Sequence, residues 1–129
     1  MKTRKKEKKI TLRTARKIAK FALEKKASDI QLLDVRKITS VTDFFIICSG
    51  DSTVQVKAIA ENIRDRCRED DISVYSLEGL DSLRWVLIDM VEVVVHVFLP
   101  DVRSYYQLER LWGDAPTEHL GDETDEATA

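Results

Sequence analysis

The sequence predicts an α/β fold in which helices flank a mixed sheet. Two short apolar runs, residues 44–48 and 93–99, are rich in β-branched and aromatic side chains, as in strands buried on both faces. Segments with helical periodicity precede, separate and follow these runs, and helices interspersed with strands favour a layered α/β arrangement. The expected order of elements is α-β-β-α-β-β-β-α.

The first half of the chain predicts two helices and two strands. Residues 12–26 place apolar side chains at helical spacing between lysines and arginines, which indicates an amphipathic helix. A strand over 30–36 and the buried strand over 44–48 follow. Ser52 and Gln55 then have the spacing of a capping box, so we expect them to begin a second helix that ends near residues 69–71.

The second half predicts three strands and a final helix. Residues 72–77 alternate as a strand, and two further strands, 85–89 and 93–99, are separated by a reversal. Pro100 ends the last strand, and Asp101 is the expected N-cap of a helix that runs to Trp112. Gly113 follows at the position where helices commonly end.

Charge divides the chain into a head, a domain and a tail. Residues 1–26 hold 12 Lys or Arg and two acids, whereas 113–129 hold six acids and no Lys or Arg. We expect a basic disordered head (1–10), a single α/β domain (11–113) and an acidic disordered tail (114–129). The basic head favours RNA or another polyanion as a partner, and a solvated extension is the alternative.

Nothing in the sequence predicts a membrane segment or export. The longest apolar run is far shorter than the ~20 residues that cross a bilayer. The charged N-terminus lacks the apolar core of a signal peptide. Cys48 and Cys67 do not form a metal-binding or redox motif, and we expect buried free thiols in a reducing compartment. The expected location is therefore cytoplasmic.

A nucleotide-binding or nucleotidyl-transferring enzyme is the alternative class. Gly50 to Ser52 precede a helix, where backbone N–H groups and the helix dipole can hold a phosphate. However, the glycine pattern and the lysine of phosphate-binding loops are missing, and a turn and a cap explain these residues equally well. Only two histidines occur, His96 and His119, and no nucleophile-elbow motif is present. We therefore expect no catalytic residue, cofactor or metal.

The last third of the chain favours a binding protein. Trp85, Tyr105, Tyr106 and Trp112 lie there, and Trp and Tyr are enriched at binding hot spots. About half of these aromatic residues are expected in the core. Trp85 follows a polar turn, so one face of its ring is expected to remain accessible.

An ordered set of motifs resembles the ribosomal silencing factor (Iojap-like) family. The resemblance covers about residues 29–116. Each motif alone is weak, but the set in this order and spacing is specific. The motifs are DVR (34–36), TDFFIICSGDS (42–52), EG (78–79), WVLID (85–89), VVHVF (94–98) and RSYYQLERLW (103–112).

The resemblance implies a fold related to nucleotidyltransferases but without their catalytic acids. It implies a cytoplasmic or organellar homodimer that binds the large ribosomal subunit through a basic ribosomal protein at the intersubunit face. Binding there blocks joining of the small subunit and represses translation. The contact or interface residues that it implies are Trp85, Arg103, Tyr106, Glu109 and Trp112. Whether the basic head also contacts ribosomal RNA stays open.

One departure from the family pattern concerns the reversal after Asp89. Family members usually place a glycine there, where this chain has Met90 and Val91. A positive φ is costly for valine, so a wider or differently aimed loop is expected, with Glu92 at an uncertain position. Asp89 and Glu92 then mark a strand reversal, and His96 lies in the following strand without catalytic partners.

Overall fold

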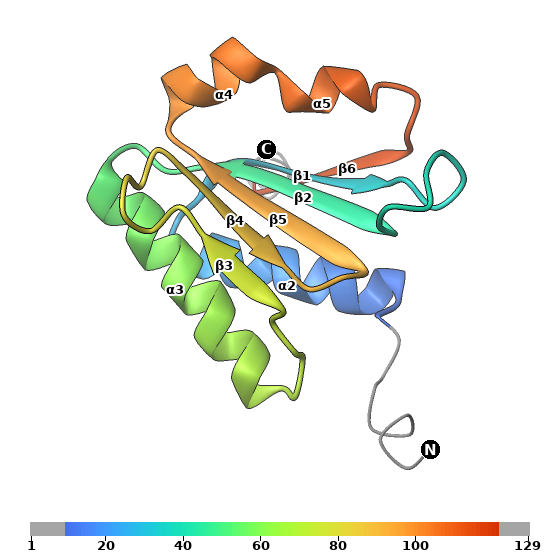
Figure 1. Ribbon diagram of the computed structural model, residues 1–129, viewed down its shortest axis with the longest axis horizontal. Coiled ribbons are helices and arrows are strands. Elements are labelled where there is room, and N and C mark those ends of the chain that lie inside the picture. Colours follow the sequence, from blue (N-terminus) through green and yellow to red (C-terminus); the bar gives the residue numbers. More distant parts are fainter. Residues whose placement is uncertain (1–9, 122–129) are drawn as a thin grey trace, which may run out of the picture.

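The fold is a six-stranded mixed sheet with helices on both faces, as Figure 1 shows. The computed structural model describes residues 10–121. The strand order is β3-β4-β5-β2-β1-β6. Helices α2 and α3 cover one face, and α4 and α5 lie over the other. The predicted mixed α/β fold with flanking helices is confirmed.

The elements have the following bounds. The helices are α2 (Leu12–Glu24), α3 (Thr53–Glu69), α4 (Pro100–Tyr106) and α5 (Leu108–Leu111). The strands are β1 (Ser28–Asp34), β2 (Phe44–Ser49), β3 (Ser76–Glu78), β4 (Trp85–Asp89), β5 (Val93–Phe98) and β6 (Thr117–Leu120).

The two apolar runs form the centre of the sheet. Strands β2 and β5 pair in parallel, from Phe44 opposite Val93 to Ser49 opposite Phe98, and every other pair is antiparallel. Every residue of β2 is buried. Strands covered on both faces need apolar side chains on both faces, which is why this run lacks alternation.

The start of α3 confirms the predicted cap. Ser52 Oγ accepts from the Gln55 backbone N–H at 3.1 Å. The Gln55 side chain bonds the N–H of Asp51, one residue before the cap, and its amide donates to the carbonyls of Lys25 and Lys26. Gln55 therefore also ties the end of α2 to the start of α3.

Several boundary predictions are wrong within the described residues, and the strand predicted over 72–77 is one of them, since β3 begins only at Ser76. The predicted helix over 101–112 is two helices, because Gln107 adopts φ 48 and breaks the run, and Leu99 rather than Asp101 occupies the N-cap. The acidic tail is not disordered from residue 114, because Thr117–Leu120 forms β6 against the free edge of β1. Ile10 is buried, so only residues 1–9 of the predicted head lie outside the described residues.

The reversal between β4 and β5 is tight, so the wider loop, one of the two expected alternatives, is wrong. Val91 adopts φ 70. The Met90 N–H donates to the Val93 carbonyl and the Glu92 N–H to the Met90 carbonyl, each at 2.8 Å. The side chain of Asp89 accepts from the Val91 N–H at 2.8 Å and helps to hold this conformation.

Candidate partner-binding surface

Trp85 lies at the start of β4, between the sheet and α4. Its ring contacts Phe98 and Tyr106, with centroid distances of 4.9 Å in both cases. Gly79, with φ 97, brings the preceding loop against the Trp85 backbone, where a Cβ atom would collide with the Trp85 carbonyl oxygen. The side chain is half-buried, so it belongs both to the core and to the surface.

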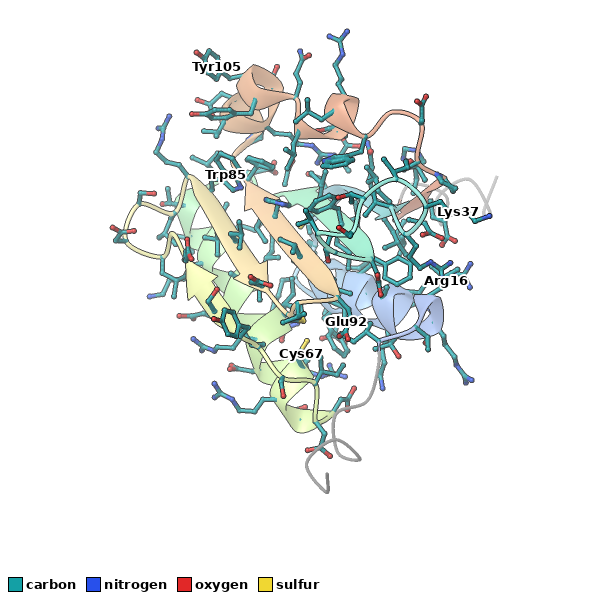
Figure 2. All side chains as sticks on the ribbon, turned by 45° about the vertical axis from the view of Figure 1, so that its right-hand side comes forward. Arg16, Lys37, Cys67, Trp85, Glu92 and Tyr105 are labelled. Atoms are coloured by element: carbon teal, nitrogen blue, oxygen red, sulfur yellow. The ribbon has the colours of Figure 1, made fainter. Side chains whose placement is uncertain are left out.

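Two neighbouring tyrosines on α4 extend this site into solvent. Tyr105 is 80% exposed and Tyr106 is 53% exposed, and their rings meet edge to face. Figure 2 shows Tyr105 on the outer side of α4 and Trp85 between that helix and the sheet. We call Trp85, Tyr105 and Tyr106 the aromatic surface. An open groove of about 500 Å³ is lined by these three residues and by Ser82, Arg84, Asp101 and Val102.

His96 orients the indole of Trp85 from below. It is 5% exposed, and its Nδ1 accepts from Trp85 Nε1 at 3.0 Å. Burial lowers the pKa of His96 to about 4, so the ring is neutral at pH 7. Phe45 and Phe98 pack around the ring, an apolar environment that suits packing rather than proton transfer.

The pairing of Trp85 with His96 was missed from the sequence. Strand β4 pairs with β5 so that Trp85 is opposite Phe98, which makes His96 its diagonal neighbour on the same face. An antiparallel alignment of WVLID with VVVHVF would have placed Trp85 next to His96. That alignment requires the tight reversal at Val91, which is unexpected for a β-branched residue.

Arg103 lies inside the domain rather than on its surface. It is 6% exposed, and its Nη1 donates to Ser49 Oγ at 2.9 Å and to the Asp29 carbonyl at 2.8 Å. Its Nε donates to Glu109 Oε2 at 3.0 Å. Arg103 and Glu109 therefore fasten α4 and α5 to the ends of β1 and β2.

Trp112 joins the same layer from the end of α5. Its ring lies 5.2 Å from that of Phe45, and it is half-buried against the core between the sheet and α4–α5. Leu111 beside it is 73% exposed. Of the five predicted residues, Trp85 and Tyr106 lie together at the groove, Arg103 and Glu109 pair beneath α4 and α5, and Trp112 lies beside Phe45.

Several backbone donors around the start of α3 already have partners within the protein. The N–H groups of Asp51 and Gln55 donate to side chains, and that of Gly50 donates to the Phe98 carbonyl. A Cβ atom on Gly50 would crowd Val56 and Ile59, so close packing explains this glycine. The turn and cap interpretation therefore accounts for the segment.

Comparison with known proteins identifies the family. Residues 7–129 match the family model described as "Ribosomal silencing factor during starvation". The chain belongs to the ribosomal silencing factor family. The family predicted from the ordered motifs is therefore confirmed.

Individual relatives of the ribosomal silencing factor family agree closely in sequence and fold. A Bacillus subtilis protein named ribosomal silencing factor RsfS is 53% identical over 105 residues, which are 81% of this chain and 89% of the relative. A crystal structure from Bacillus halodurans has a TM-score of 0.75 at 41% identity and covers 85% of this chain and all of that chain. A Chromobacterium violaceum structure has a TM-score of 0.71 at 43% identity, with coverages of 77% and 86%.

Metal binding, membrane insertion and thiol reactivity find little support within residues 10–121 of this domain. Within residues 10–121, no group of three or more His, Cys, Asp or Glu side chains is placed to hold a metal ion. None of the helices in that range is both long and apolar enough to cross a bilayer. Cys48 and Cys67 are buried free thiols, as predicted, and burial raises the pKa of each to about 12.

Proposed function

We propose that this chain is a non-enzymatic, cytoplasmic translation repressor that acts as a homodimer. It binds the large ribosomal subunit through a basic ribosomal protein at the intersubunit face and blocks joining of the small subunit. Membership of the ribosomal silencing factor family supports a role in translation. The aromatic surface is the observation that carries the binding site.

The composition of this surface favours a protein partner. Exposed Tyr105 and Tyr106 and half-buried Trp85 offer large, rigid contact area at low entropic cost. Residues 27–112 hold nine Lys or Arg against 15 acids, which favours a basic partner by charge complementarity. Arg103 and Glu109 act as positioning residues that fix α4 and α5, and Trp112 supports the layer from below.

Sedimentation with purified ribosomal subunits tests this function. We expect the protein to cosediment with the large subunit and to reduce the fraction of joined ribosomes. Tyr105→Ala in combination with Tyr106→Ala should weaken binding by about 30-fold or more, as expected for the loss of hot-spot aromatics. Tyr75→Ala is the matched control, because Tyr75 is 77% exposed but lies before β3, away from α4.

The wild-type protein tests the proposed function, and the double tyrosine variant tests the proposed binding surface. If the wild-type protein neither cosediments with the large subunit nor reduces joined ribosomes, the proposed function is wrong. If the double tyrosine variant binds as well as Tyr75→Ala, the partner contacts a different surface.

A further inference from the structure

The solvent face of α2 carries four cations in a row. Arg13, Arg16, Lys17 and Lys20 are exposed, and Arg16 and Lys17 each lie three or four residues from both Arg13 and Lys20, so the four share one side of the helix. We call these four residues the basic stripe. The opposite side of α2 is buried and apolar, with Ala15, Ile18, Ala19, Phe21 and Ala22 in the core.

Few acids compete with the basic stripe. The only acid within α2, Glu24, accepts from Asn62 Nδ2 at 2.9 Å and from Arg66 Nη1 at 2.6 Å, so α3 occupies it. Arg13 and Lys20 have no ion-pair partner among residues 10–121. These two cations are therefore available to an external anion.

The other two cations are held in ion pairs at the flanks of the stripe. Arg16 pairs with Glu118 on β6 at 2.6 Å, and Lys17 pairs with Asp70 after α3 at 2.8 Å. Both cations remain half-exposed, and surface pairs of this kind contribute at most ~1 kcal/mol. Glu118 accepts from Nε and Nη2 of Arg16, which leaves Nη1 of that guanidinium for a second anion.

The basic stripe and the aromatic surface lie on opposite faces of the sheet. Figure 1 shows α2 and α4 separated by the strands, and Figure 2 places Arg16 on the α2 side and Tyr105 on the α4 side. A ligand on α2 therefore leaves the aromatic surface free for a protein.

We propose that the basic stripe binds the sugar-phosphate backbone of RNA. The choice of RNA over other polyanions rests on the proposed function, because RNA is the polyanion that a ribosome-bound protein meets. Four cations along about 10 Å of helix match a line of phosphates rather than a single small anion. The stripe contains no aromatic side chain to stack on bases, so binding is independent of sequence.

Fluorescence anisotropy with a mixed-sequence single-stranded RNA tests this inference on the full chain. Arg13→Gln combined with Lys20→Gln removes two cations while keeping good helix formers. We expect affinity to fall about tenfold at 0.15 M salt, and the slope of log K against log salt to lose about 1.4. Lys57→Gln combined with Arg110→Gln is the matched control, because it removes two exposed cations outside α2.

The control variant distinguishes a binding site on α2 from an effect of net charge. If both double variants lose affinity equally, diffuse net charge binds RNA and the basic stripe is not the site. If neither variant changes the affinity or the slope, α2 does not contact RNA. If the α2 variant loses binding only to vesicles that contain anionic lipid, the partner is a membrane surface and the inference is also wrong.

This test does not depend on the aromatic surface, because no ribosomal subunit is present. RNA binding that requires α2, together with failure to cosediment with the large subunit, would leave the inference intact and overturn the proposed function. Cosedimentation with the large subunit, together with RNA binding that does not require α2, would leave the proposed function intact and overturn the inference. Circular dichroism of each variant shows whether the fold is retained.

Discussion

Val91 holds a backbone conformation that is costly for a β-branched side chain. Its φ of 70, with the Glu92 N–H bonded to the Met90 carbonyl, describes a tight turn of the rare, strained kind. Strain of this type costs on the order of 1–3 kcal/mol, whereas glycine in the same place costs about 0.5–1 kcal/mol in unfolded-state entropy.

We therefore expect Val91→Gly to raise the melting temperature by a few degrees. Val41→Gly is the control, because Val41 is also exposed but does not have a positive φ. That variant should lower the melting temperature slightly. Equal losses in both variants, measured by thermal denaturation, would show that the Val91 backbone stores no strain.

His96 makes stability depend on pH. Burial lowers its pKa from 6.5 to about 4, so the unfolded chain binds a proton more readily than the folded chain. As the pH falls from 6.5 to 4, the unfolded state gains protons that the folded state does not, and the free energy of unfolding decreases. The loss is on the order of 3 kcal/mol for a shift of this size, and it is complete below about pH 4.

Urea unfolding at pH 7, 6 and 5 measures this dependence. His96→Gln keeps a hydrogen-bond acceptor for Trp85 but does not titrate in that range. The variant should show a much flatter profile between pH 7 and 5. A variant with the same slope as the wild type would assign the dependence to other groups.

The α4–α5 element depends on one buried ion pair. Removing Glu109 takes away the nearer of two carboxylates around the buried Arg103 guanidinium, at 3.0 Å, and leaves the exposed Asp29 carboxylate at 4.0 Å, together with the bonds to Ser49 and the Asp29 carbonyl. We expect Glu109→Ala to lower the free energy of unfolding by about 2 kcal/mol or more. Glu118→Ala removes an exposed pair with Arg16 and should cost less than about 1 kcal/mol. Similar losses in both variants, measured by urea unfolding, would contradict the positioning role of Glu109.

The elements that depend on local pattern were predictable, and those that depend on distant partners were not. The buried runs of β2 and β5 and the Ser52 cap follow from neighbouring residues. Strand β6 is short, lies in the acidic C-terminal segment and pairs with an edge of β1 that β2 leaves free. The break at Gln107 could not be predicted, because the left-handed residue there is not a glycine.

The candidate site shows the same division. Aromatic enrichment near Trp85 and Tyr106 can be read from the sequence, and both residues line the groove. The inward direction of Arg103 cannot be read, because its partners Ser49 and Asp29 lie 54 and 74 positions away. The motif over residues 103–112 thus contains both surface residues and residues that hold α4 and α5 against the sheet.

At the scale of the whole molecule, the basic stripe and the aromatic surface lie on opposite faces of the sheet. The α2 helix presents cations, whereas the α4 helix presents aromatic rings. Such a molecule approaches a charged surface in a preferred orientation, because opposite sides meet different local potentials. Two independent contacts also raise overall affinity when both can form at once.

The parallel pairing of β2 with β5 sets the order in which the domain can be completed. Phe44 meets Val93 and Ser49 meets Phe98, so each partner is 49 residues distant along the chain. Long-range parallel pairing is slow, since a large loop must close before any contact forms. During synthesis β2 has no β5 beside it until residue 98 has been added. A nascent chain shorter than this leaves one edge of the apolar strand β2 without its partner, so this regulator of translation cannot close its own core until β5 has been made.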